Sequence, residues 1–528
     1  MLNKFNMKLN KYAFLALVVG MTTVSCVEDE GNNIISEINE IEISGLEESY
    51  SCVSGEDVLT ITPEIKGSLS DTDESNLEYE WFLCNKAIDK DHVHEVIGRE
   101  RNLSYPVTAA PANYVLYLSV KDKTTNLKWE ASTNFNIISP FVRGFYLFGD
   151  KEDGNVGLDF VSIMEGRDTF VVKNVLNNDL NLKGAENIFF SGTYTSTSSR
   201  LWAFTESGDY RVECGAAQTS FNLMPEVSDL DKLFFPTVEV KKPYNLVDVH
   251  PYAYGSSNTD NSRSNRLMLT ENEIFFGSML SGEAFGNPVN RYSSSTTELY
   301  KPSKYVFYKH SSYISYYVFY DEENRCFTRM NGATYSFTYT PKLTNNGTPF
   351  YWDQNEYEAK RDLVYGQNGV GNAGRSYALM KDTNGDYFVY LFTVGHYSPS
   401  MITANAERTI DLGVATDFDQ ADHYAFYSMQ QILLYAAGAK LYAYDYARNE
   451  CKLVKDFEAE ITHLAMDFNS NNDNNHFVVA TYDDTEKGVV YGYSIEDNQN
   501  AINVTPIEAE EWHTDLKVVK VEYRNCSY

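Results

Sequence analysis

The sequence lacks the patterns that mark several large functional classes. No C-x-x-C pair occurs, which excludes zinc ribbons and thioredoxin-type redox sites. No G-x-S-x-G elbow and no P-loop sequence occur, which argues against an α/β-hydrolase and against a P-loop nucleotidase. After residue 26, no stretch approaches the roughly 18 uninterrupted apolar residues of a membrane-spanning helix. These absences remove the commonest enzyme and transporter signatures.

Basic residues are also scarce, because 43 Lys and Arg face 74 Asp and Glu, for a net charge of −31. A field of this sign repels phosphate backbones and anionic lipid, so we expect no nucleic-acid partner and no adhesion to a membrane by charge. Seven Cys are scattered along the chain. Cys52 and Cys84 would either bridge within one domain or be buried free thiols.

The N-terminus carries the strongest signal. Three lysines, Lys4, Lys8 and Lys11, precede a short apolar core at 13–19, and small and polar residues then lead to Cys26. The core is too short to span a bilayer, so residues 1–25 are predicted to be a signal peptide.

A small residue followed by Cys26 at the cleavage point resembles the lipobox of bacterial lipoproteins, although Thr23 stands where that family usually has Leu. The resemblance implies acyl chains on Cys26, and several chains together give stable anchoring. The alternative is an ordinary signal peptide with an incidental Cys. Residues 26–33 form an acidic tether, and Glu28-Asp29-Glu30 is similar to the export signal of surface-exposed lipoproteins in Bacteroidetes. This implies an outer-membrane, cell-surface location.

Residues 34–139 alternate short strand-like runs with turn clusters, at the size of an immunoglobulin-like sandwich of about 100 residues. Within 114–120, every second residue is apolar, as one buried face of a strand requires. Tyr79-x-Trp81 followed by the strand that starts at Tyr114 resembles the PKD domain, in which Trp81 would fill the space between two sheets. We therefore predict a PKD-like β-sandwich with Tyr79, Trp81 and Tyr114 in structural roles.

Residues 141–528 repeat strand pairs separated by Gly, Asn and Asp turns, most clearly over 431–445. The unit is similar to a β-propeller blade, and at about 40–50 residues per blade the region predicts seven or eight blades. The alternatives are a pair of β-sandwiches or a β-solenoid. Only two short segments, 407–411 and 507–512, suggest helices, so the whole chain is predicted to be all-β.

Two segments offer candidate sites. The aromatic run 305–320 would place Tyr on both faces of a strand pair, so that one face packs and the other binds peptide, glycan or a partner protein. Its candidate ligand-binding residues are Tyr308, Tyr313, Tyr316, Tyr317 and Tyr320, and core packing is the alternative.

The second segment spaces oxygen ligands as the start of a calcium loop does, at Asp467, Asn469, Asn471 and Asp473. The Gly and Glu that complete such a loop are absent, and a polar turn is the alternative. The G-x-G-x-x-G sequence at 369–374 precedes a predicted hairpin rather than a helix, so it predicts no dinucleotide site. We predict no catalytic residue, no metal and no cofactor.

Taken in order, the lipoprotein signal, the acidic tether, the PKD-like domain and the Tyr-rich β region resemble the PKD-like family lipoproteins of Bacteroidetes. The resemblance implies an accessory subunit beside a SusC/RagA-type TonB-dependent transporter and a SusD/RagB-type lipoprotein, in the uptake of nutrients such as oligopeptides. It implies a non-enzymatic role. Two alternatives stay open: a surface glycan-binding protein, and a propeller enzyme acting as a glycosidase, lyase or peptidase.

Overall fold

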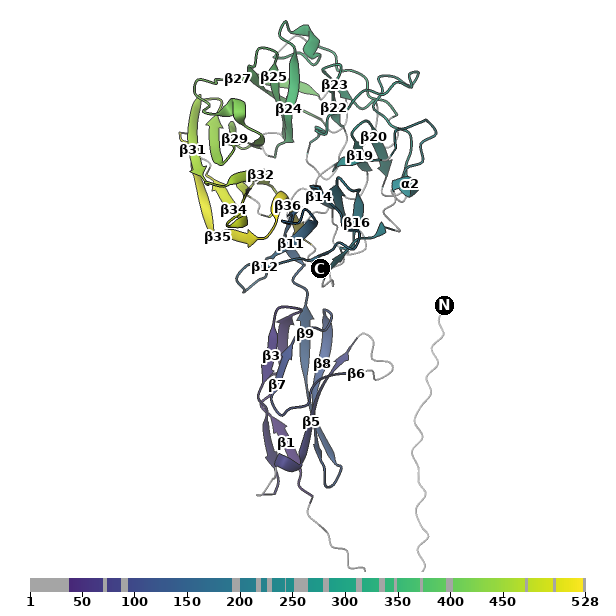
Figure 1. The fold of residues 1–528 in the computed structure, drawn as a ribbon, viewed down its shortest axis with the longest axis vertical. Coiled ribbons are helices and arrows are strands. Elements are labelled where there is room, and N and C mark those ends of the chain that lie inside the picture. Colours follow the sequence, from purple (N-terminus) through teal and green to yellow (C-terminus); the bar gives the residue numbers. More distant parts are fainter. Residues whose placement is uncertain are drawn as a thin grey trace, which may run out of the picture.

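The computed structural model describes two β parts that follow one another along the chain (Figure 1). The description covers residues 38–525 apart from 70–73, 87–93, 192–199, 215–219, 226–229, 243, 251–264, 279–283, 310–315, 332–337, 346–348, 371–373, 396–401, 471–472 and 497–499. The predicted lipid-bearing Cys26 and its tether therefore lie outside the described residues. In Figure 1 a narrow sandwich stands below a ring of sheets, as a stalk below a head.

The stalk is a sandwich of one large sheet and two small ones, ordered β2-β9-β8-β5-β6, β1-β4 and β3-β7. Its strands are β1 (Ile41–Ser44), β2 (Ser49–Val53), β3 (Val58–Ile61), β4 (Glu64–Gly67), β5 (Leu77–Asn85), β6 (His94–Gly98), β7 (Leu103–Pro106), β8 (Ala112–Asp122) and β9 (Lys128–Ile138).

The stalk has a single filled core, because alternate residues of β5 and β8 point inward. Trp81 is fully buried at its centre, and its ring nitrogen donates to the carbonyl of Glu100 at 3.0 Å. Tyr114 is buried and donates its hydroxyl to the carbonyl of Ala110 at 2.8 Å, while Tyr79 packs at the margin of the core. Cys52 lies in the same core as a buried free thiol. The predicted all-β class with an immunoglobulin-like first domain is confirmed.

The head is a β-propeller, whose described residues form seven sheets around one axis (Figure 1). We number these blades along the chain. Blades 1 to 3 contain β10 (Arg143–Asp150), β11 (Val156–Ser162) and β12 (Phe170–Val172), then β14 (Ala185–Ser191), β15 (Arg200–Thr205) and β16 (Tyr210–Val212), then β18 (Leu246–His250), β19 (Asn265–Thr270), β20 (Ile274–Ser278) and β21 (Ala284–Phe285). Two short strands, β13 (Leu176–Asn177) and β17 (Phe221–Asn222), pair beside the first two blades.

Blades 4 to 7 follow in the same manner. They contain β22 (Val318–Asp321) and β23 (Cys326–Arg329), then β24 (Arg361–Asn368), β25 (Arg375–Asp382), β26 (Tyr387–Thr393) and β27 (Thr403–Ile410), then β28 (His423–Tyr427), β29 (Ile432–Ala437), β30 (Lys440–Asp445) and β31 (Glu450–Asp456), then β32 (Glu460–Asp467), β33 (His476–Asp483), β34 (Lys487–Ile495) and β35 (Val504–Thr514). Blade 4 is the thinnest, and its inner segment joins β22 through two isolated bridges, from Pro302 to Asp321 and from Phe307 to Val318.

The two ends of the propeller sequence meet in blade 1 and close the ring. The C-terminal strand β36 (Lys517–Asn525) pairs antiparallel with β10, so blade 1 has the order β12-β11-β10-β36. Because β36 is the innermost strand, its residues Lys520 to Tyr523 lie at the axis. Closure by pairing leaves no open sheet edge between the first and last blades.

The two short segments that suggested helices, 407–411 and 507–512, lie mainly in outermost strands, β27 and β35, in agreement with the predicted all-β class. In β35, Trp512 and Thr514 are buried while Glu511 and His513 are exposed, which is the alternation of a strand. Their Ala and Glu content favours helix, but pairing with the neighbouring strand decides the outcome. The described part contains one short helix, α2 (Leu230–Leu233), and 3-10 turns η1 (Glu74–Asn76), η4 (Gln354–Glu356) and η6 (Phe418–Gln420). None of these helical segments has the length and apolar character needed to span a bilayer.

Hydrogen bonds from side-chain amides join neighbouring blades near the axis. The side-chain amide nitrogen of Gln367 donates to the backbone carbonyl of Phe426 at 2.7 Å. The side-chain oxygen of Gln367 accepts from the backbone N–H of Phe426 at 2.8 Å. Asn368 likewise bridges to Val306 and Tyr308 of blade 4, at 2.8 and 2.9 Å. Buried amides that are fully bonded fix the register between elements. These hydrogen bonds hold the inner segments in place around the axis.

Candidate ligand pocket at the propeller axis

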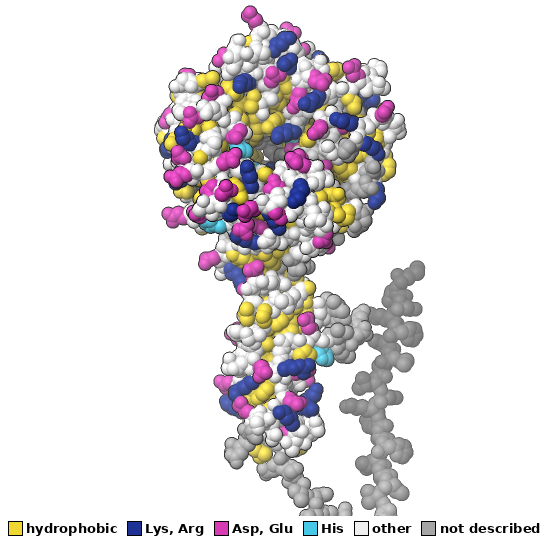
Figure 2. Space-filling view, in the orientation of Figure 1, with side chains coloured by type: hydrophobic (Ala, Val, Ile, Leu, Met, Phe, Trp, Pro, Cys, Tyr) yellow, Lys and Arg dark blue, Asp and Glu magenta, His cyan; other side chains and the backbone are white. Residues whose placement is uncertain are grey.

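A cavity of about 800 Å³ lies at the axis of the propeller. Every blade contributes to its wall, and Figure 2 shows the hollow in the middle of the head with His and Lys or Arg side chains near it. Pockets of a few hundred to about 1,000 Å³ are typical of small-molecule sites. The polar lining residues include Glu186, Asn187, Asp248, Lys304, Tyr305, Tyr365, Gln367, Asp422, His423, Tyr424, His463, Asp467, Lys520 and Glu522.

The fold explains why polar side chains gather here. Each innermost segment pairs with a strand on its outer side only, so its inner edge faces the axis and needs no apolar cover. The space between blades is filled instead by apolar clusters, such as the one that joins Ala425 and Leu434 of blade 6 to Phe477 of blade 7. The axis is therefore the part of the head that packing leaves open.

Three tyrosines from consecutive blades, Tyr305, Tyr365 and Tyr424, form one wall of the pocket, which we call the tyrosine wall. The Tyr305 and Tyr365 ring centroids are 5.4 Å apart, and those of Tyr365 and Tyr424 are 5.8 Å apart. Burial raises the pKa of Tyr305 to about 12 and raises those of the other two, so all three are neutral phenols at pH 7. Tyr365 donates to Gln367 at 2.9 Å and Tyr424 to the Ala421 carbonyl at 2.6 Å.

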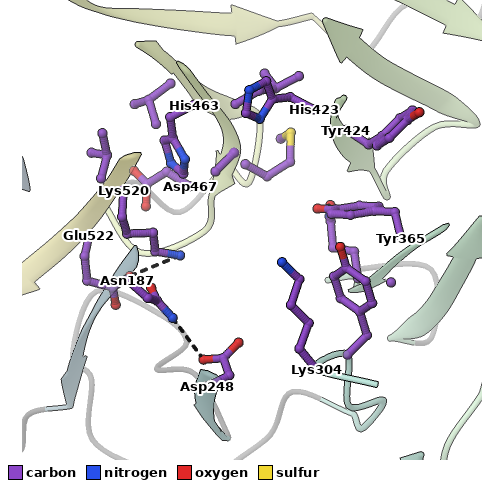
Figure 3. Close-up of a pocket in the computed structure, with 18 of the residues that line it drawn as sticks. Asn187, Asp248, Lys304, Tyr365, His423, Tyr424, His463, Asp467, Lys520 and Glu522 are labelled. Carbon is purple, nitrogen blue, oxygen red and sulfur yellow. Dashed lines mark hydrogen bonds and ion pairs between the residues drawn. The ribbon is translucent and has the colours of Figure 1, made fainter. Parts of the chain in front are cut away.

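The opposite side of the pocket is polar (Figure 3). Asn187 donates to Asp248 at 3.3 Å, and the Lys520 ammonium lies 3.9 Å from the Glu522 carboxyl. Burial raises the pKa of Glu522 to about 7, against a smaller lowering by Lys520. A protonated Glu522 is therefore accessible near neutral pH, and in that state the group can donate a hydrogen bond.

Two histidines of the lining are held neutral by their surroundings. Burial lowers the pKa of His463 far below its usual value, and the charge of Lys520 lowers it further. Burial also lowers the pKa of His423, whose neighbour Asp422 partly opposes the shift. His463 is 8% exposed, and its Nε2 atom has no hydrogen-bond partner among the described residues. A buried imidazole nitrogen in this state lacks an interaction that a ligand can supply.

Lys304 projects its ammonium into the middle of the pocket (Figure 3). The Nζ atom lies 5.5 Å from the centroid of the Tyr305 ring, a cation–π distance. Within the described part of the chain, Lys304 has no carboxylate within ion-pairing distance. Burial raises the pKa of the lining residue Glu186 and the charge of Lys304 partly opposes this shift, so Lys304 interacts with that carboxyl without forming an ion pair.

The predicted calcium residues serve other contacts. Asp467 accepts hydrogen bonds from the backbone of Asn469 and Ser470 at 2.9 and 3.2 Å, which makes the polar turn after β32. Its other oxygen lies 2.8 Å from His476, whose far nitrogen lies 2.6 Å from Glu510. These two carboxylates raise the pKa of His476 to about 9 against the opposing effect of burial, so the imidazole is charged.

A calcium site at this turn is therefore not supported. Asp473 is exposed beyond the turn, and Asn471 lies outside the described residues. No group of three or more His, Cys, Asp and Glu in the described ranges is placed to hold a metal ion.

The tyrosine candidates of the aromatic run are corrected by their burial. Four of them, Tyr308, Tyr316, Tyr317 and Tyr320, are at most 7% exposed and belong to a core cluster with Phe327 and Trp352. They fill the interior between blades, so they cannot line a ligand surface. Tyr313 lies outside the described residues. Tyr305, at the start of the same run, is the one that reaches the axis.

Reasoning from the sequence missed the pocket because its residues come from separate segments of seven blades. No local motif marks them, since each inner segment contributes only a few polar residues. The available signal was polar side chains inside otherwise apolar innermost strands, such as His423 at the start of β28 and Glu522 in β36. That signal becomes readable only when the strand order within each blade is known.

Comparison with known proteins adds to this geometry. The family model of the PKD-like family matches residues 26–183, which span the stalk and strands β10 to β12 of the head. None of the curated proteins matches the chain in sequence.

Among solved structures, a quinonprotein alcohol dehydrogenase-like protein from Bacteroides thetaiotaomicron is similar at 13% identity and a TM-score of 0.40, over 90% of this chain and 97% of that one. The β-propeller domain of Cps50 (Swd1) from Myceliophteria thermophila is similar at 10% identity and a TM-score of 0.36, over 68% of this chain and 97% of that one. A post-proline cleaving enzyme from Rickettsia typhi is similar at 10% identity and a TM-score of 0.30, over 62% of this chain and 47% of that one. At the family level the chain is thus similar to PKD-like proteins over its N-terminal part, and its function has to be argued from the pocket.

Proposed function

We propose that this protein is a non-enzymatic binding subunit, anchored at the cell surface through acyl chains on Cys26, whose propeller captures a small polar organic ligand at its axis. The observation that carries the proposal is the axial pocket of about 800 Å³, which combines a tyrosine wall with charged groups from the facing blades. Aromatic faces supply contact area, and a few placed polar groups supply orientation.

Binding without turnover fits the groups that line the pocket. The described lining contains no Ser, Thr or Cys, so it offers none of these as a nucleophile for a neighbouring base to activate. Asp467 is occupied by a backbone turn and by charged His476. His463 is buried and has no hydrogen-bonded carboxylate that would orient it as a general base. A propeller enzyme is the less favoured alternative on these grounds.

The surroundings of the pocket suit a role beside a transporter. In sequence the stalk follows residues 26–33 and precedes the head, and Asp57 of the stalk forms a two-bonded ion pair with Arg167 of blade 1, at 2.7 and 2.9 Å. A head raised above the membrane would capture ligand and pass it to a SusC/RagA-type transporter with its SusD/RagB-type lipoprotein. The resemblance to PKD-like lipoproteins favours an oligopeptide as the ligand.

A glycan is the second candidate ligand. The specific observation in its favour is the tyrosine wall, because the flat faces of sugar rings stack on aromatic side chains. A calorimetric titration with both classes of compound distinguishes oligopeptide binding from glycan binding.

Calorimetric titration of the purified protein with a set of short peptides and a set of oligosaccharides tests binding. We expect one set to bind and Tyr365→Ala to weaken that binding at least about tenfold, because the ring is central in the tyrosine wall. Tyr339→Ala is the matched control, since Tyr339 lies in the propeller away from the pocket lining. No heat from either set, or release of a chemically altered product, contradicts the proposal.

Anchoring and partnership are tested in cells. We expect labelled fatty acid to enter the wild type and not Cys26→Ser, and we expect gentle detergent extraction to recover a large outer-membrane barrel with the wild type. An unlabelled wild type rejects the anchor. A wild type that is recovered alone rejects the transporter partnership while leaving ligand binding intact.

A further inference from the structure

We propose that the axial pocket selects its ligand by a carboxylate group, which Lys304 and Tyr305 hold, while His463 accepts a hydrogen bond from a second group of the same ligand. This inference rests on the proposed binding function and names the chemical class of the ligand. The chemistry is a small organic acid that also carries a hydroxyl or N–H donor.

The unpaired ammonium of Lys304 favours a ligand that carries a carboxylate. The other lining lysine, Lys520, has Glu522 at 3.9 Å, whereas Lys304 has no comparable partner among the described residues. Lys304 is an exposed residue whose ammonium can make a charge-assisted contact with an anion. Figure 3 shows this ammonium directed into the open volume and not along the wall, so an anion can reach it.

The neighbouring residue, Tyr305, offers a second hydrogen-bond donor to the same carboxylate. The hydroxyls of Tyr365 and Tyr424 are committed to protein acceptors, but that of Tyr305 has no hydrogen-bond partner in the part of the chain that the structure describes. With its pKa raised to about 12 by burial, this phenol keeps its proton and can donate to a carboxylate. An ammonium and a phenol on consecutive residues give an anion two donors of different kinds.

The position of this pair is fixed from behind. The backbone carbonyl of Lys304 lies 3.3 Å from Nε2 of His250 on the neighbouring blade, and the amide of Tyr305 donates to Ser303 at 3.3 Å. The Tyr305 ring also meets Tyr365 edge-on at 5.4 Å. Donors held in place before the ligand arrives lose little freedom on binding.

His463 supplies the third point, on the polar side of the pocket (Figure 3). The ring is neutral, and a hydrogen bond to the backbone of Val519 accounts for one nitrogen. The other, Nε2, is buried and without a partner among the described residues. In a neutral imidazole whose first nitrogen donates, the second accepts, so the group that meets Nε2 must be a donor.

Two classes of ligand combine a carboxylate with a hydrogen-bond donor. A peptide presents its C-terminal carboxylate with backbone N–H donors, and an acidic sugar presents a ring carboxylate with hydroxyl donors. Calorimetry with matched acid and neutral probes distinguishes them: the peptide Ala-Ala-Tyr against its C-terminal amide, and D-glucuronate against D-glucuronamide. Each pair has the same skeleton, and only the acid presents the carboxylate that Lys304 would hold.

We expect the acid of one pair to bind at least about tenfold more tightly than its neutral partner, as a charge-assisted contact implies. Lys304→Gln should abolish this preference by weakening the acid alone, and Lys304→Arg should retain most of it because the positive charge remains. Lys440→Gln is the matched control, since Lys440 belongs to the same propeller and pairs with Asp417 at 3.7 Å outside the pocket lining. Circular dichroism of each variant establishes that the fold is unchanged.

Equal binding of acid and neutral partners by the wild type overturns the carboxylate inference while leaving a binding function in place. Unchanged acid binding by Lys304→Gln overturns the role of this lysine. If none of the four probes binds but longer neutral peptides or oligosaccharides do, the inference fails and the proposed function stands. If nothing binds in any series, both fail.

Discussion

The stalk and the head are both built from antiparallel strands, yet they use their interiors in opposite ways. The stalk packs its sheets over one core that Trp81 fills at 0% exposure. The head divides its apolar residues among clusters between blades and keeps a cavity of about 800 Å³ at its axis. A filled sandwich offers a partner only its surface, whereas a closed ring of sheets encloses a space that polar side chains can line.

The difference between the two interiors places the groups that can meet a ligand in the head. In the stalk, the inward-facing residues pack against one another in the core. In the head, the innermost strands have one edge without a neighbour, and there Lys304, His463 and Glu522 stay within reach of a ligand. The following experiments sharpen or break this contrast, from the largest expected effect to the smallest.

Deleting residues 517–528 removes β36 and should have the largest effect. Blade 1 would lose its innermost strand, and the ring would open along β10. We expect complete loss of cooperative unfolding of the head, with the stalk still folded, as followed by denaturant titration with circular dichroism and limited proteolysis.

The control for this deletion removes only 526–528, which follow β36. It should unfold as the full chain does. A head that still unfolds cooperatively without β36 would show that closure of the ring does not hold the propeller together.

Trp81→Ala should destabilise the stalk by about 3–5 kcal/mol, because it leaves a cavity in a filled core. The head has its own clusters and should keep its transition midpoint. Urea unfolding with separate probes of the two parts measures this, and Glu78→Ala on the same strand serves as the control because Glu78 is exposed. A matching loss in the head would mean that the two parts unfold as one unit.

His476 makes the stability of the propeller depend on pH. Its pKa is raised to about 9 in the folded protein by Asp467 and Glu510, against about 6.5 in an unfolded chain. The stabilisation is therefore full below pH 6.5 and is lost as pH rises through 9. Its size is of the order of 2–3 kcal/mol.

Measuring the stability of wild type and His476→Gln at several pH values tests this dependence. The difference between them should shrink between pH 6.5 and 9.5. His513→Gln is the control, because His513 is exposed on the outermost strand of the same blade. A difference that stays constant across this range would show that the charge on His476 contributes nothing.

The smallest effect is expected at the junction of the two parts. The Arg167 guanidinium holds the pKa of Asp57 below its usual value. The pair is partly exposed, so Asp57→Asn should cost less than about 1 kcal/mol. It should nevertheless loosen the head on the stalk, which small-angle X-ray scattering would detect as a broader distribution of interatomic distances; an unchanged distribution would mean that other contacts fix the junction.

Sequence reasoning reached the fold class because period-two patterns are local. The alternation across 114–120 and the strand–turn–strand unit at 431–445 are visible without any partner strand, and both form strands as expected. The segments 407–411 and 507–512 suggested helices by composition yet form outermost strands, because composition alone cannot tell an outermost strand from a helix. The number of blades stayed between seven and eight, since the thin blade 4 carries a weak pattern.

The amino-acid sequence by itself determined an acidic, strand-rich chain with a compact first domain and a repeating second part, because charge, hydrophobic period and turn residues act over a few neighbours. The export signal stays a prediction. Only the tertiary structure decided that Tyr308, Tyr317 and Tyr320 are interior while Tyr305 reaches the axis, and that Lys304 stands across from His463. The physical reason is that a propeller assembles its pocket from the edges of seven sheets, and which edge faces the axis depends on pairing between β10 and β36, more than 350 residues apart.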